Sequence, residues 1–327
     1  MPSLPRIRML AMGGTISSVA TAGTAEVSPS LKAEQLIESV PELASVASIE
    51  WGDMTTIASF AVTLADMHEL ALAVEQARAD GVDGVVITHG TDTIEETAYA
   101  LALMVPRGFG IVLTGAMRNP MLPGADGHGN LLAAFLAAAH PTLAHLGPVL
   151  VFNDEIHAAR FVSKSHSTRP STFASAGSGP IGEVIEGRVY VWFTPAYDDE
   201  LGLPDAPPVP RAPLIKVASE IDDLVLRAAI ESRPDAVVIE GFGGGHALPP
   251  LLDAIDDAIA RGIPVVMAPR VFAGRTLERT YRIPGAETDL IDRGVIPAGH
   301  IAGHKARLRV IVGRALGREA SSLFPVL

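Results

Sequence analysis

Short apolar runs rich in β-branched residues alternate along this chain with segments whose apolar residues recur at helical spacing. In residues 65–79 the apolar side chains recur every three or four positions, and Thr63 with Asp66 forms a capping box at the start. The runs that read as buried strands are 7–12, 84–88, 110–116 and 148–154. Strands joined through helices pair in parallel, so the alternation predicts an α/β fold with a mainly parallel sheet flanked by helices.

A second, shorter series of the same kind follows. Its strands and helices are expected at 214–218, 221–231, 236–241, 249–260 and 264–269. Ahead of it, residues 203–213 contain five prolines, which disfavour both a helix and an interior strand. We therefore expect a larger N-terminal domain over 1–202, a proline-rich linker, and a smaller C-terminal domain over 214–327. A chain of 327 residues is long enough for two cores.

Composition restricts the setting and the partners of the chain. The formal charge of -12, with no cluster of Lys and Arg to offset it, argues against nucleic acid as a partner. The longest apolar stretch, 131–139, is too short to cross a bilayer, so we expect no membrane association. There is no cysteine, which excludes disulfides, thiolate metal ligands and a Cys nucleophile. With no cleavable secretory signal recognised, a cytoplasmic location is expected.

Two turns at predicted strand ends carry glycines, hydroxyl groups and a carboxylate. They are "MGGT" (12–15) and "THGTDT" (88–93). In parallel α/β sheets the ligand crevice lies at the carboxyl ends of the strands, and glycine lets the backbone approach a ligand closely. The polar groups are therefore expected to face a ligand. The alternative is that Thr91, Asp92 and Thr93 only cap the next helix, where Thr93 and Glu96 match a second capping box.

A lysine among hydroxyl residues is a further candidate. A threonine hydroxyl is a poor nucleophile until a neighbouring group takes its proton, and a lysine held near an aspartate can do so. In "RFVSKSHST" (160–168) an apolar, strand-like lead-in precedes Lys164, although a lone lysine of this kind is usually a solvated surface residue. The histidines show no ligand pattern such as HExxH, and His300 with His304 lacks a third ligand, so no metal is expected.

Taken together, these motifs resemble the bacterial-type L-asparaginases, the two-domain amidohydrolase family that includes the glutaminase-asparaginases. The resemblance covers essentially the whole chain. Its most specific pieces are "AMGGTIS", "VVITHGTDTIEETAYAL" and "VLTGAMRNP", and weaker ones are "FVSKSHST", "GFGGGH" (241–246) and "GAETDLIDRGVIPAGHIAGHKAR" (285–307). It implies hydrolysis of the side-chain amide of L-asparagine to L-aspartate and ammonia through a threonine acyl-enzyme, as part of asparagine catabolism and without a cofactor.

The resemblance also implies roles for the residues of the two turns and for the lysine. Carried over by position, the nucleophile is Thr15, and the threonine, aspartate and lysine that assist it are Thr91, Asp92 and Lys164. Amide hydrolysis needs a nucleophile, a path for protons and donors aimed at the developing oxyanion, and these residue types supply the first two. Backbone N–H groups near Thr91 are expected to help supply the third.

Substrate contacts and assembly follow from the same resemblance. Ser59 stands where the family binds the substrate carboxylate, and Asp92 can hold the substrate ammonium. Ala116 stands where a backbone group helps to hold the amide oxygen. Glu287 matches an acid that approaches the substrate amino group from a neighbouring subunit. A homo-oligomer with shared active sites, either a dimer or a dimer of dimers (a homotetramer), is therefore implied.

Two departures from the family pattern concern the substrate and the base. Phe60 stands where the family usually has a glutamine that contacts the substrate carboxylate. The loop 17–30 contains no tyrosine, which the family usually has as a proton acceptor, and Glu26 occupies the corresponding place. We hypothesise that Glu26 acts as the base for Thr15. If Glu26 does not act as the base, Thr91 and Lys164 must do so.

These departures leave other functions open. A glutaminase, a hydrolase of another small amide, and a catalytically weak amino-acid-binding sensor all fit the same motifs. A dinucleotide-binding protein is disfavoured, because His246 replaces the third glycine of GxGxxG after the strand at 236–241.

Overall fold

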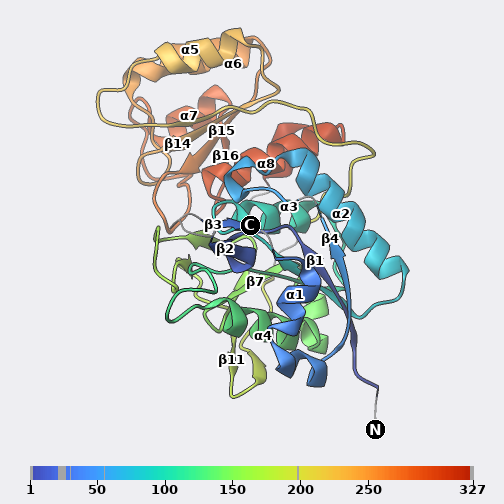
Figure 1. Cartoon of the computed structure of the whole chain (residues 1–327). Coiled ribbons are helices and arrows are strands. Elements are labelled where there is room, and N and C mark those ends of the chain that lie inside the picture. Colours follow the sequence, from blue (N-terminus) through green and yellow to red (C-terminus); the bar gives the residue numbers. More distant parts are fainter. Residues whose placement is uncertain (1–2, 21–26, 30, 55, 197–198, 325–327) are drawn as a thin grey trace. The chain divides into compact units, whose positions relative to one another are not determined.

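The chain divides into two compact α/β units, Met1–Leu203 and Pro204–Leu327, each described here by itself (Figure 1). The computed structural model describes residues 3–20, 27–29, 31–54, 56–196 and 199–324. Residues 203–213, all of which are described, contain neither a helix nor a strand. None of the described helices is long and apolar enough to span a membrane.

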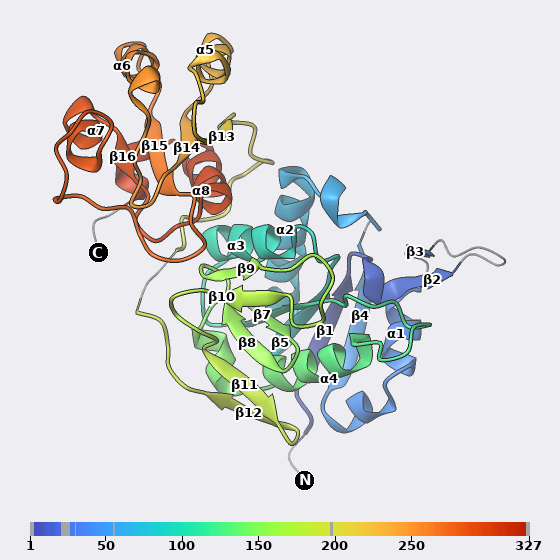
Figure 2. The same cartoon turned by 90° about the vertical axis from the view of Figure 1, so that its left-hand side faces the viewer.

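An eight-stranded sheet lies at the centre of the first unit (Figure 2). In chain order its strands are β1 (Arg6–Ala11), β4 (Ser48–Asp53), β5 (Gly84–Thr88), β6 (Gly110–Thr114), β7 (Val149–Phe152), β8 (Glu155–Ala158), β11 (Gly182–Ile185) and β12 (Arg188–Val191). In space the order is β12-β11-β8-β7-β6-β5-β1-β4. Strands β4, β1, β5, β6 and β7 pair in parallel, whereas β8, β11 and β12 extend the sheet antiparallel. The mainly parallel sheet is thus confirmed, with an antiparallel extension.

Helices cover both faces of this sheet (Figure 2). They are α1 (Ala33–Glu38), α2 (Leu64–Ala79), α3 (Ile94–Met104) and α4 (Gly127–Ala138). Helices α1 and α4 share one core with the sheet, in which Leu36, Phe135 and Val112 are buried together. Helices α2 and α3 contact each other and the central strands. The first unit also contains two antiparallel strand pairs. One pairs β2 (Ser18–Ala20) with β3 (Val27–Pro29), and the other pairs β9 (Val162–Lys164) with β10 (Phe173–Ser175).

One predicted capping box is confirmed and the other is wrong. At α2, the Thr63 hydroxyl accepts from the amide of Asp66, whose carboxylate accepts from the amide of Thr63. At α3 the helix does begin after Thr93, but no capping box with Glu96 forms, because the Thr93 side chain caps no amide. Its hydroxyl instead donates to the backbone carbonyl of Ser59 at 2.6 Å. The Thr93 hydroxyl therefore bonds Ser59, which is distant in the chain, and not an amide of its own helix.

The second unit has a four-stranded parallel sheet. Its strands, in spatial order, are β13 (Leu214–Lys216), β14 (Val237–Gly241), β15 (Val265–Pro269) and β16 (Ile296–Pro297). Helices α5 (Leu224–Glu231), α6 (Leu252–Ala260) and α7 (Glu287–Arg293) contribute to its core, and α8 (Gly303–Ala315) contacts the first three strands. The 3-10 turns of the chain are η1 (Thr15–Ser17), η2 (Pro41–Ser45), η3 (Ser59–Ala61), η4 (Pro141–His145), η5 (Pro249–Leu251) and η6 (Ala320–Leu323).

The glycine-rich stretch 241–246 forms a tight turn after β14. The amide of Phe242 donates to the carbonyl of His246, and the amide of His246 donates back to the carbonyl of Phe242, both at 2.9 Å. The chain then continues to the proline-led turn η5 before α6. Because the glycines do not open a helix, this turn lacks the helix N-terminus that follows the strand and glycine turn of a dinucleotide site.

Glycines let the turns after β1, β5 and β6 pack backbone against backbone. Gly14 has a φ of 96°, and a Cβ there would lie 2.6 Å from the amide nitrogen of Gly90. A Cβ at Gly115 would lie 2.5 Å from the carbonyl oxygen of His89. Distances this short leave no room for a side chain, so the approach of the three turns depends on these glycines.

We expect Gly14→Ala to lower the free energy of unfolding by about 2 kcal/mol or more, because its Cβ would meet backbone atoms and its φ is left-handed. Gly129 is the matched control, since it lies in α4 and an added Cβ there meets nothing within 4 Å. Gly129→Ala should raise the free energy of unfolding by about 0.5–1 kcal/mol. Urea unfolding of both variants measures the difference, and equal effects would contradict the packing argument.

Candidate active site

A cavity of about 350 Å³ opens at the turns that follow β1 and β5. It is lined by Gly14, Thr15, Ser18, Ala58, Ser59, Phe60, Gly90, Thr91, Asp92, Met117, Lys164 and Ser167. Thr15, Ser59, Thr91, Asp92 and Lys164 are all residues that the sequence singled out. The parallel pairing of β1 with β5 places the ends of both strands at one edge of the sheet, which is why the two turns meet there.

The local sequence "GGTISS" fixes the position of Thr15. The carbonyl of Gly14 accepts three hydrogen bonds, from the amide of Ser17 at 3.1 Å and from the hydroxyls of Ser17 and Ser18 at 2.9 Å each. Ile16 is 2% exposed and belongs to the core of the first unit. The buried neighbour and the bonded carbonyl hold the turn, so that Thr15 lines the cavity.

His89 supports the second turn from inside the protein. Its ring is buried, with Nδ1 2.7 Å from the carbonyl oxygen of Gly90 and Nε2 3.0 Å from the hydroxyl of Thr97 on α3. Burial lowers the pKa of His89, which keeps the ring neutral at neutral pH. No role for His89 was predicted from the sequence. The signal for it was a histidine directly after a buried strand.

Lys164 connects the two polar residues of this turn. Its Nζ donates to Thr91 Oγ1 at 3.0 Å and to Asp92 Oδ1 at 2.7 Å. The hydrogen bond from Lys164 holds the pKa of the Asp92 carboxyl below its ordinary value, against the opposing effect of partial burial. The three side chains form a hydrogen-bonded unit in which a proton can pass between a lysine amine and a threonine hydroxyl.

The backbone around Lys164 is also fixed. Lys164 ends β9, where it pairs with Phe173 of β10. Its amide donates to Glu95 Oε1 on α3 at 3.3 Å, and the amide of Ser165 donates to the carbonyl of Thr172 at 2.7 Å. The hairpin therefore places Lys164 beside the turn that precedes α3.

Ser59 is bound to the same turn. Its hydroxyl donates to Asp92 Oδ2 and accepts from the amide of Asp92, both at 3.2 Å. The next residue, Phe60, lines the cavity with 78% of its surface exposed. Ala116 is buried, and the residue after it, Met117, lines the cavity.

Glu287 belongs to the second unit and is not among the cavity-lining residues named above. It is 3% exposed, and it accepts from the amides of Thr280 and Tyr281 at 2.7 and 2.6 Å and from His246 Nε2 at 3.0 Å. Burial alone would raise the pKa of the Glu287 carboxyl, but these hydrogen bonds, with that from Tyr281 the strongest, hold it below its ordinary value.

Glu26 lies outside the residues that the structure describes. Within the described residues, no group of three His, Asp or Glu side chains is placed to hold a metal ion.

Comparisons with known proteins agree with this geometry. Residues 6–197 match the family described as "Asparaginase, N-terminal", and residues 211–322 match the "Glutaminase/Asparaginase C-terminal domain". A probable L-asparaginase of Deinococcus radiodurans is 36% identical over 98% of this chain and 96% of its own. An L-asparaginase of Bacillus licheniformis is 31% identical over 96% of this chain and 97% of its own.

A solved structure shares the fold. The crystal structure of a probable cytoplasmic L-asparaginase from Campylobacter jejuni superposes with a TM-score of 0.87 at 28% identity, over 98% of this chain and 99% of its own. Both family matches lie in the two α/β units, and together they span most of the sequence. The chain belongs to the asparaginase family.

Proposed function

We propose that this protein hydrolyses the side-chain amide of L-asparagine to L-aspartate and ammonia, with Thr15 as the nucleophile. The observation that carries the proposal is the hydrogen-bonded unit of Lys164, Thr91 and Asp92, at a cavity that Thr15 also lines. Family membership and the names of the relatives support the choice of asparagine.

The proposed reaction has two steps. In the first, Thr15 Oγ1 forms a bond to the amide carbon, the C–N bond breaks, and ammonia leaves with the proton that the hydroxyl gave up. In the second, water attacks the ester, the aspartate carboxylate leaves, and Thr15 regains its proton. Thr91 and Lys164 carry protons in this scheme, with Glu26 as the other candidate base. Backbone N–H groups at Thr91 and Ala116 are the proposed oxyanion donors.

The proposed substrate contacts combine two copies of the chain. Ser59 binds the substrate carboxylate and Asp92 binds its ammonium, which suits a carboxylate kept ionised by Lys164. Glu287 of a neighbouring subunit supplies a second acid in a homo-oligomer, a dimer or a dimer of dimers. The cytoplasm is the proposed location, in keeping with the name of the Campylobacter jejuni relative and a sequence without cysteine.

One observation favours a second substrate. Phe60 lines the cavity, and its phenyl ring offers no hydrogen-bond donor to a free α-carboxylate. A glutaminase, or a hydrolase of another small amide, is therefore the second candidate. Ammonia release from a panel of amides distinguishes these enzymes. Tight binding of an amino acid without ammonia would instead indicate a sensor.

Removing the hydroxyl of Thr15, or a hydroxyl or amine of the unit, should abolish turnover while the fold persists. We expect Thr15→Ala, Thr91→Ala and Lys164→Met each to lower kcat by roughly a thousandfold or more. Thr63→Ala is the matched control, because it removes a helix cap at α2 and should cost about 1 kcal/mol of stability without changing kcat. Ammonia release and thermal unfolding are measured on each variant. A folded site variant that keeps a tenth of parental turnover would remove that residue from the mechanism.

Restoring a donor at position 60 should improve asparagine binding. Phe60→Gln is expected to lower the KM for L-asparagine about tenfold to a hundredfold, since a charge-assisted hydrogen bond contributes roughly 1.5–3 kcal/mol. Phe60→Leu is the control, because it removes the ring without adding a donor and should not lower KM. Steady-state kinetics decide the matter. An unchanged KM for Phe60→Gln would mean that backbone groups already satisfy the carboxylate.

Shared active sites predict complementation between two inactive variants. A Thr15→Ala chain and a Glu287→Gln chain, co-expressed at equal levels, should assemble hybrids with one intact site. Random pairing as dimers then restores about a quarter of the parental activity. Light scattering gives the oligomeric state of the same samples. An active monomer at assay concentration, or hybrids no more active than the parent variants, would refute the shared site.

A further inference from the structure

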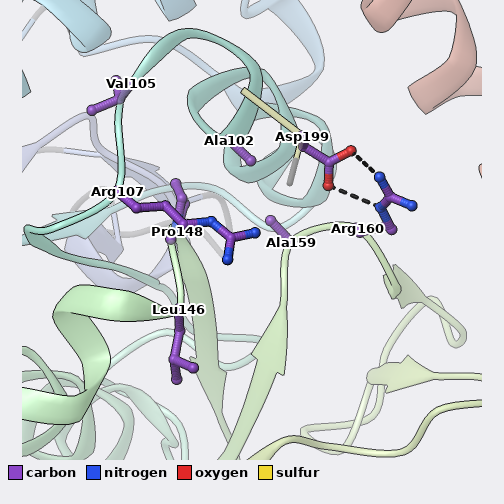
Figure 3. Close-up of a pocket in the computed structure, with 9 residues that line it drawn as sticks. Ala102, Val105, Arg107, Leu146, Pro148, Ala159, Arg160 and Asp199 are labelled. Carbon is purple, nitrogen blue, oxygen red and sulfur yellow. Dashed lines mark hydrogen bonds and ion pairs between the residues drawn. The ribbon is translucent and has the colours of Figure 1, made fainter. Parts of the chain in front are cut away.

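A second hollow in the first unit is too small for a ligand. Figure 3 shows Arg107 extending across it towards Ala159, with Arg160 and Asp199 facing each other at its edge. Its volume is about 10 Å³, which is room for about one water molecule. The charged side chains around it therefore do not form a binding site, and their burial needs another explanation.

Asp199 is the centre of a buried hydrogen-bond network. Its carboxylate accepts from Arg160 Nε at 2.9 Å and from Arg160 Nη2 at 2.5 Å, the two bonds drawn in Figure 3. It also accepts from the hydroxyl of Tyr99 at 3.1 Å. Arg160, Asp199 and Tyr99 are 7%, 3% and 0% exposed. A buried ion pair adds little net stability, but its paired, directional bonds hold the joined segments in one geometry.

The segments joined by Asp199 are those that carry the active-site unit. Tyr99 lies on α3, the helix that follows Thr91 and Asp92 in the chain. Arg160 lies four residues before Lys164 and two residues before the start of β9. The segment that contains Asp199 is itself held to the end of α3, because the amide of Leu201 donates to the carbonyl of Leu103 at 2.7 Å.

We infer that Tyr99, Arg160 and Asp199 form a positioning network that sets the distance between Lys164 Nζ and Thr91 Oγ1. The inference rests on the proposed function, in which that contact carries a proton. None of the three belongs to the described residues that line the active-site cavity, so they act through Lys164 and do not touch the substrate. A misplacement of about 1 Å between reacting groups can lower a rate by about a hundredfold, so a remote network of this kind can control kcat.

The test removes one bond of the network without changing its packing. Tyr99→Phe deletes only the hydroxyl group that donates a hydrogen bond to Asp199. We expect it to lower kcat about tenfold with KM within about twofold, because substrate contacts are untouched. Arg160→Lys is the second variant, since it keeps the charge but loses the two-bond geometry, and it should act in the same direction. Ile7→Val, at the other end of β1 from Thr15, is the control, with a lower Tm and an unchanged kcat.

A double-mutant cycle separates positioning from simple stability. Tyr99→Phe is also made in the Lys164→Met chain, and ammonia release and Tm are measured for all four proteins. If the network acts through Lys164, the tenfold loss of kcat shrinks to less than about twofold in that background, while the change in Tm persists. An equal loss of kcat in both backgrounds, or a lowered Tm with unchanged kcat in the parent, overturns the inference alone. Full activity of Lys164→Met overturns the proposed function as well.

Discussion

The close contact of three glycine turns is the constraint on which the site depends. Gly14 and Gly115 bring the chain after β1 and β6 so close to the turn after β5 that a Cβ on either would meet its backbone, and a Cβ at Gly90 would lie 2.6 Å from the side chain of Ser59. Parallel pairing alone leaves neighbouring strands about 4.8 Å apart, and their turns then diverge according to their own sequences. Here the backbones of the turns remain in contact, so Thr15 and Thr91 line one cavity. Glycine thus determines where the hydroxyls lie, although it contributes no chemistry itself.

The charge pair at the cavity contributes little to stability. The side chain of Asp92 is 52% exposed and that of Lys164 is 16% exposed, and pairs open to solvent contribute little to folding. The Asp92 carboxylate also accepts a hydrogen bond from the hydroxyl of Ser59, and the Asp92 amide donates one to the same hydroxyl. The carboxylate is therefore oriented as well as ionised. A lysine held between an oriented carboxylate and a threonine hydroxyl fits the proton transfer that we propose for it.

The sequence predicted the parts of this protein whose signals are local. The strand 84–88 and the helix after Thr63 agree with the structure, since apolar periodicity and caps are read within one segment. Thr93 was predicted wrongly because its hydroxyl bonds Ser59, which is 34 residues away in the chain. His89 was missed because its supporting role depends on the hydrogen bond to Thr97 on the next helix and on burial, which a short motif does not show. The antiparallel strands β8, β11 and β12 were also not predicted, being four residues each and without a helix between them to mark the order.

The position of Lys164 shows why polar contacts are needed around a small hairpin. β9 and β10 have three residues each, and a two-stranded pair of this size is not stable alone. Hydrogen bonds to the surrounding protein are directional, so they add to the apolar packing that holds the hairpin. Ser175 of β10 bonds the buried ring of His157 at 2.9 Å, and burial lowers the pKa of His157 to about 4, so this contact carries no charge at neutral pH. A neutral hydrogen bond at Ser175 on β10 and a charged pair at Arg160, two residues before β9, therefore join both sides of the hairpin to the rest of the unit.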